Sequence, residues 1–275
     1  MASIDRAAAA LALLLLAGAA HAQTFPFLGD EARKRGIDLP EPFGVGVVYY
    51  YLDRSIDIQD VRVGRNGNTP QSVSNFAAFG AQARVNNANL KFDVWLLPFL
   101  NVYAIAGYIW NESQTTIDVT LPPLLPNGPP RQRTLTVPTS MTGTVGGIGV
   151  TVAGGYGPLF FAGDVNMAQA NLGFDDRFHA VVTSVRAGWN GKAGGRPIRT
   201  WINATYWDTF AKATGTVADP DGGTLSFEVD QGPAHPWTFG VGAAYGVKKW
   251  LDVAIDAGGD FNGGYYVAVV PVFRF

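Results

Sequence analysis

The 275-residue sequence contains no cysteine and only three histidines. Without cysteine the chain can form neither a disulfide framework nor a thiolate metal site. Three histidines are too few for a histidine-rich metal cluster, so we expect no metal and no other cofactor. Charged residues make up 15% of the chain, and the formal net charge is −2. A chain so close to neutral gives no reason to expect a nucleic-acid partner.

Long apolar runs are scarce as well, and the clearest one lies near the N-terminus. It covers residues 7–20, and at 14 residues it is too short to cross a bilayer about 30 Å thick as a helix. Arg6 precedes the run, and a small-x-small sequence follows it at residues 20–22. These features are typical of a secretory signal peptide. We predict that residues 1–22 are cleaved and that the mature chain is secreted across the inner membrane.

Glycine and aromatic residues, in contrast, are abundant, with 34 glycines and 12% aromatics. From Phe43 onward, apolar and polar residues alternate with a period of two, and turn residues interrupt the pattern. Low charge, much glycine and many aromatics suit a sheet with lipid on one side and a crowded lumen on the other. We predict an all-β fold: one closed antiparallel transmembrane β-barrel over residues 43–275. About ten strands are expected, with eight or twelve as alternatives.

The expected strands and connections follow the asymmetry of outer-membrane barrels, which have short turns at one end and long loops at the other. The strands cover residues 43–61, 82–97, 102–119, 133–153, 159–169, 178–189, 197–217, 224–247, 251–261 and 265–275. Short periplasmic turns are expected at 98–101, 154–158, 190–196 and 248–250, and long extracellular segments at 62–81, 120–132 and 208–236. A soluble β-sandwich or lipocalin-like barrel is the alternative, and its apolar faces would point inward.

The last hairpin predicts one ion pair. Residues 262–264, Asn-Gly-Gly, form a strong hairpin turn signal. If Phe261 faces Tyr265, then Asp252 lies opposite Arg274 on the polar face of the sheet. We therefore predict that these two side chains pair inside the barrel.

A second hairpin surrounds the turn at residues 219–223. Pairing Val217 with Thr224 places Ile202 opposite Phe239, so the apolar faces of both strands coincide. Because a slip of one residue would turn every side chain to the other face, this pairing is the predicted register.

The alternation assigns a set of polar side chains to the lumen, where unpaired charges are costly and should find partners. The predicted lumen-lining residues are Lys91, Asp93, Asp164, Asn166, Arg186, Arg199, Trp201, Asn203, Asp252, Asp256 and Arg274. The outer face should carry two aromatic girdles at the levels of the lipid headgroups. Their predicted members are Tyr103, Phe161, Trp189, Trp250, Phe273 and Phe275 at the periplasmic end, and Trp110, Trp207 and Trp237 at the other.

The final strand resembles the C-terminal insertion signal of bacterial outer-membrane β-barrel proteins. It ends in an aromatic residue, has another two residues earlier, and alternates before that; the residues of this signal are Tyr265, Val267, Val269, Phe273 and Phe275. Pro271 departs from the usual pattern, because it removes a donor from the strand interior. The resemblance implies an outer-membrane location, contact with outer-membrane lipids, and recognition of the strand by the barrel-assembly machinery.

The leader at residues 23–42 does not have the sequence pattern of a β-strand. Residues 29–36 are predicted to form one or two helical turns, ended by Gly36 and by the prolines at 40 and 42. This periplasmic leader would lie beneath the barrel or enter it, and a disordered leader is the alternative.

Three functions are compatible with such a barrel. The first is a structural role or a narrow channel for a small polar solute or ion; ten strands enclose too little space for a general diffusion porin. The second is surface binding or adhesion, in which the long loops contact an extracellular ligand. The third is an outer-membrane enzyme, a protease or a lipid-modifying enzyme, for which His179 with Ser184, or His235, would be candidates. No local motif supports a catalytic site, so we predict no enzyme.

Overall fold

The structure of this protein is a computed structural model that describes residues 25–37, 39–72, 77–121, 131–172, 178–218 and 223–275. The predicted signal peptide at residues 1–22 lies outside these ranges. One short helix, α2 (Gly29–Lys34), precedes a chain that is mostly β-strand. No helix of the described residues is long and apolar enough to cross a membrane.

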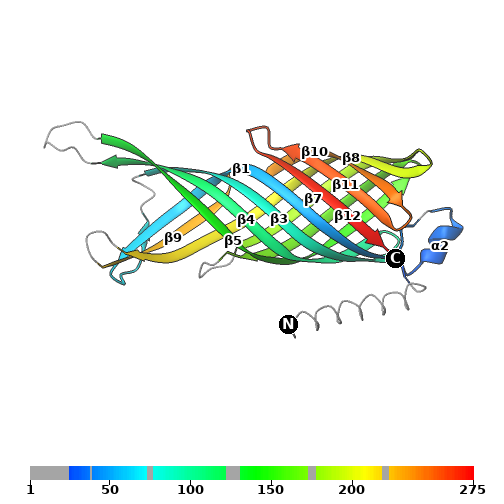
Figure 1. Ribbon diagram of the computed structural model, residues 1–275, viewed down its shortest axis with the longest axis horizontal. Coiled ribbons are helices and arrows are strands. Elements are labelled where there is room, and N and C mark those ends of the chain that lie inside the picture. The colour runs from blue at the N-terminus through cyan, green and yellow to red at the C-terminus, as the bar shows by residue number, and fades with distance from the viewer. Residues whose placement is uncertain (1–24, 38, 73–76, 122–130, 173–177, 219–222) are drawn as a thin grey trace.

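Twelve strands form one antiparallel sheet that closes on itself (Figure 1). They are β1 (Phe43–Arg65), β2 (Gln71–Ser72), β3 (Ala77–Leu97), β4 (Leu100–Leu121), β5 (Arg131–Tyr156), β6 (Leu159–Asn171), β7 (Phe178–Ala193), β8 (Arg196–Ala218), β9 (Thr224–Pro233), β10 (Trp237–Lys248), β11 (Leu251–Gly259) and β12 (Tyr265–Arg274). β2 is a two-residue strand beside β1, and β9 and β10 are two parts of one interrupted strand along β8. Ten strands therefore build the barrel, as predicted.

The connections at one end, hereafter the short-turn end, are only two residues long. These turns lie at residues 98–99, 157–158, 194–195 and 249–250. Gly194 and Gly195 have φ values of 58° and 76°, a conformation that residues with a Cβ rarely adopt and that suits the right-handed twist of a hairpin. The first and last strands also meet at this end, where the backbones of Phe43 and Phe275 exchange hydrogen bonds of 3.1 Å. The predicted short turns are thus confirmed.

At the opposite end the strands differ in length and project unequally (Figure 1). The β4–β5 ladder runs without interruption to Leu121↔Arg131. On one edge, β1 pairs with β3 as far as Ile56↔Ala81; on its other edge it pairs with β12 up to Asp53 and with β9 from Ile56 to Arg65. The predicted long loops at 62–81 and 208–236 are therefore wrong in large part, because most of their described residues are paired in strands. Most of the predicted loop at 120–132 lies outside the described residues.

Arg62 stabilises the pairing of β1 with β9 through ion pairs. Its guanidinium contacts Asp60 at 2.6 Å, Glu228 at 3.0 Å and Asp230 at 3.2 Å. The hydrogen bond from Arg62 lowers the pKa of the Glu228 carboxyl, and the same bond raises the pKa of the Arg62 guanidinium. Two carboxylates of β9 are thereby held to one cation of β1.

The predicted register of the last hairpin is wrong by two residues. Leu251 pairs with Phe273, and Asp252 pairs with Val272 rather than with Arg274. The connection is longer than predicted because Asp260, which is buried, accepts hydrogen bonds from the backbone N–H groups of residues 262 and 264 at 2.8 and 2.9 Å. Its side chain replaces the expected strand pairing with a five-residue loop.

The β8–β9–β10 register also differs from the predicted one. Val217 pairs with Leu225 instead of Thr224, and Ile202 pairs with Val241 instead of Phe239. β9 and β10 pair with β8 in different registers because residues 234–236 interrupt the strand. Because the error is two residues in β10, the faces there were still assigned correctly.

The outer face of the barrel carries the expected aromatic residues, with two corrections. The exposed rings near the short-turn end are Phe161, Trp189, Trp250 and Phe273, and those farther out include Trp110 and Trp237. Tyr103 and Trp207, predicted on the outer face, point into the lumen, where they hydrogen-bond to Asp164 and Thr238. Tyr103 was misassigned because the turn before β4 is only two residues long and a register shift follows Trp95.

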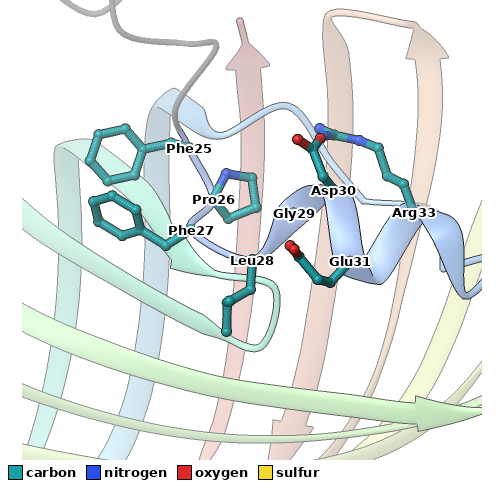
Figure 2. A pocket seen from close by; sticks show the side chains of 8 residues that line it. All are labelled: Phe25, Pro26, Phe27, Leu28, Gly29, Asp30, Glu31 and Arg33. Atoms are coloured by element: carbon teal, nitrogen blue, oxygen red, sulfur yellow. The ribbon is translucent and has the colours of Figure 1, made fainter.

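The N-terminal segment lies beyond the short-turn end of the barrel (Figures 1 and 2). The N–H of Phe27 donates to the carbonyl of Leu96 at 2.8 Å, and the ring of Phe25 contacts Phe43 with 5.7 Å between centroids. A shallow groove runs between this segment and α2, lined by residues of the segment itself (Figure 2). The segment is thus docked against the ends of β1 and β3.

Candidate functional site

The lumen is built from rows of side chains that lie along the wall over glycines. The first row joins Asp93 of β3, Gly44 of β1 and Arg274 of β12, which are neighbours in register. Arg274 Nη1 contacts Asp93 Oδ1 at 3.1 Å, and Asn101 donates to the same oxygen at 2.9 Å. A Cβ at Gly44 would overlap the Asp93 carboxylate. The partner of Arg274 is therefore Asp93, not the predicted Asp252.

A second row lies on β4, β5 and β6. Tyr103 Oη donates to Asp164 Oδ1 at 2.9 Å. The tyrosine reaches this carboxylate by lying across Gly149, where a Cβ would overlap the ring. Lys91 Nζ stands 4.3 Å from the centroid of the same ring, and Asn166 is the register partner of Gly149.

The third and largest group lies on β8, β11 and β12. Trp201 Nε1 donates to Asp256 Oδ2 at 2.6 Å, across Gly242 of β10. Asn203 donates to the same carboxylate at 2.9 Å, and Tyr266 Oη lies 2.7 Å from Asp256 Oδ1. Asp256 thus receives hydrogen bonds from three side chains, which satisfies a carboxylate inside a barrel.

The remaining predicted lumen residues are more exposed. Arg199 contacts Asp252 at 2.9 Å, with side-chain exposures of 44% and 25%. Arg186 stands 5.8 Å from the centroid of the Trp201 ring and is exposed although it lies beside the lumen residues. Each predicted lumen residue therefore lies on the inner face, but the ion pairs differ from the predicted one.

The glycine rows predict a packing effect. Replacing Gly149 with valine should lower the free energy of unfolding by about 1–3 kcal/mol, because the new side chain would displace Tyr103 from Asp164. Urea unfolding of the refolded barrel in detergent micelles, followed by tryptophan fluorescence, measures this loss.

The matched control is Gly163→Val on the outer face of β6, where no heavy atom lies within 4 Å of an added Cβ. β-Branched residues are favoured in strands, so this variant should be as stable as the parent. Equal losses in both variants would contradict a specific role for the Gly149–Tyr103 contact.

A cluster that the sequence did not predict lies toward the long-strand end. We call Tyr50, Arg54, Trp207 and Tyr266 the outer cluster. Tyr50 stacks on Tyr266 with 5.6 Å between centroids and contacts Trp207 at 5.5 Å. Arg54 Cζ lies 5.5 Å from the Trp207 centroid, and its Nη2 donates to Thr209 at 3.0 Å.

The outer cluster connects β1 with β8, which are linked at this end of the barrel by β9, because β9 pairs with both strands. The inward alternation of β1 and β8 was the available signal. The cluster could not be predicted once Trp207 was placed in the outer girdle, because its ring is the contact between the two strands.

The inner face is polar and internally paired, whereas the outer face is apolar and has aromatic residues at two levels. A soluble sandwich or lipocalin would have the opposite arrangement. The chain therefore has the fold of a closed antiparallel β-barrel with the polarity of a transmembrane barrel.

Several solved outer-membrane barrels are similar to this one in architecture. OprG from Pseudomonas aeruginosa has a TM-score of 0.42 and 11% identity, covering 86% of this chain and 100% of that chain. The transport unit of the autotransporter AIDA-I from Escherichia coli has a TM-score of 0.36 and 8% identity, covering 91% and 98%. The toluene transporter TodX from Pseudomonas putida has a TM-score of 0.32 and 10% identity, covering 85% and 88%.

No protein-family model matches the sequence, and no curated protein is significantly similar to it. The structural likenesses are too weak to assign a solute, a ligand or a partner.

The catalytic pairing of His179 with Ser184 is wrong for this barrel. The two residues are five apart on β7, so they lie on opposite faces: His179 is exposed, and Ser184 is buried on the inner face. In the described ranges, no hydrogen bond or ion pair is made by the side chain of His179 or of His235, and no group of three or more residues that could hold a metal ion occurs. The described geometry offers no base beside a nucleophile.

Proposed function

We propose that this protein is a narrow outer-membrane channel for small ions and polar solutes, with its short-turn end in the periplasm. The observation that supports the proposal is the arrangement of the lumen side chains along the wall. In a plugged barrel, side chains from opposite walls would meet across the axis. Here Tyr103, Trp201 and Tyr266 lie flat over glycines and bond to nearby strands.

Exposure of charged side chains points the same way. Arg186 and Arg199 are exposed, which means that the lumen around them is open to water. The outer cluster gathers three aromatic rings and the buried Arg54 guanidinium at one level of the lumen, so we place the constriction there. A barrel of ten strands still encloses far less space than a 16-stranded porin. Small ions should pass, whereas sugars should not.

Planar-bilayer recording of the refolded protein in potassium chloride tests the proposal. We expect discrete single-channel currents, smaller than those of a 16-stranded porin because the lumen is narrower. Proteoliposomes should not swell in solutions of a disaccharide, since the outer cluster excludes solutes of that size. A folded barrel that passes no current would overturn the channel and leave a structural role. Binding of an extracellular ligand by the projecting strands stays a prediction.

A further inference from the structure

Arg54 differs from the ion-paired arginines of the barrel. It is only 8% exposed, and one of its nitrogens, Nη2, donates to Thr209. Its Nε and Nη1 atoms are buried and have no hydrogen-bond partner in the protein. Arg62, Arg84, Arg199 and Arg274 each contact a carboxylate, at distances of 2.6 to 3.2 Å. Arg54 is therefore a buried cation with free donors and no ion pair.

A buried guanidinium without a partner is costly, because an uncompensated charge in a region of low dielectric destabilises the fold by several kcal/mol. Water would satisfy the N–H groups but would not neutralise the charge. The acidic residue whose charge acts on Arg54 is Asp260. The Oδ1 atom of Asp260, however, already accepts from two backbone N–H groups of its own loop.

A second free donor lies in the same cluster. The Oη atom of Tyr50 is buried and has no hydrogen-bond partner, and its ring contacts the Trp207 ring that also carries the Arg54 guanidinium. Hydroxyl and guanidinium N–H groups together form a set of donors around a positive charge. Such a set complements an acceptor with a negative charge.

We propose that Arg54, assisted by Tyr50, binds a small monovalent anion, such as chloride or a short carboxylate, in the outer cluster. The anion accepts hydrogen bonds from the free guanidinium donors and supplies the missing charge. The binding site stands without the channel. Only its consequence, selectivity of the pore for anions, rests on the proposed function, since the site lies at the constriction.

Binding is tested by the stability of the refolded barrel in urea, because a ligand of the folded state raises its stability. The midpoint should be higher in sodium chloride or formate than in sodium gluconate of equal ionic strength, since gluconate is too bulky for the cluster. Arg54→Gln should lose this difference. Arg186→Gln is the matched control, because Arg186 also stands over a tryptophan but is exposed; it should keep the difference.

The absence of any chloride effect in the parent protein would overturn the proposal, and so would a chloride effect that survives in Arg54→Gln. If Arg54→Gln fails to fold, Arg54→Lys serves as a second variant: it keeps the cation but loses the guanidinium geometry, so it should show a smaller chloride effect. An unchanged effect in Arg54→Lys would count against the geometric argument.

Selectivity is measured separately, as the reversal potential of the bilayer current in a gradient of potassium chloride. The parent channel should prefer chloride, and Arg54→Gln should lose the preference. A chloride effect on stability without any current would refute the channel but retain the anion site. Current without a chloride effect would refute the anion site but retain the channel.

Discussion

Asp93→Ala is expected to lower the free energy of unfolding by about 3–5 kcal/mol, because removal of one partner leaves the other charge buried and unpaired. The Asp93 side chain is completely buried, and its partner Arg274 is 17% exposed. The pair also joins β3 to β12 across β1, so it lies at the closure of the barrel. Urea unfolding of the refolded protein measures the loss.

The barrel supplies its own control in the Arg199–Asp252 pair, which has the same residue types but exposures of 44% and 25%. Exposed pairs contribute about 0–1 kcal/mol, so Asp252→Ala should change the free energy of unfolding only slightly. Adding Arg274→Met to Asp93→Ala should restore much of the lost stability, because a buried pair replaced by apolar groups is often neutral. If the double variant is no more stable than Asp93→Ala, the unpaired charge is not the cause.

Trp207→Ala is expected to increase the single-channel conductance several-fold. The indole of Trp207 on β8 contacts both Tyr50 and Arg54 of β1, so it packs at the centre of the outer cluster. Its removal should widen the constriction. The measurement is single-channel recording in potassium chloride, on protein whose heat-modifiable gel migration shows that it is folded.

Trp201→Ala is the control for this effect. Trp201 also faces the lumen, but it lies flat over Gly242 and bonds to Asp256. Its removal should change the conductance little, because it leaves the width of the constriction unchanged. Equal increases in both tryptophan variants would show that total side-chain volume, not the outer cluster, limits the current.

The strand number and most strand faces could be predicted from the sequence, and the reason is visible in particular strands. In β5 the outward apolar residues Ile148, Val150 and Val152 alternate with Gly149 and Thr151, so only one register turns the apolar face outward. β4 gave no such contrast, because Tyr103 and Ile105 on the inner face are as apolar as their neighbours on the outer face.

The charge partners could not be predicted, because they depend on contacts that are distant in sequence. Arg274 meets Asp93 only after β12 has closed on β1, and the pair needs Gly44 between them. The predicted pairing of Arg274 with Asp252 failed because the side chain of Asp260 lengthens a turn. Arg54 was missed for the same kind of reason: its environment is formed by β8, which lies more than 150 residues later in the chain.

The change of partner along β1 has a mechanical consequence. Between Gly44 and Asp53 this strand is joined to β12, and from Ile56 to Arg65 it is joined to β9. The barrel is therefore closed by two seams in tandem on one continuous strand. If β1 separates from β12, the pairing of β1 with β9 remains. The ion pairs of Arg62 with Glu228 and Asp230 stabilise that second pairing. Loss of the pairing between β1 and β12 alone therefore does not open the barrel along its whole length.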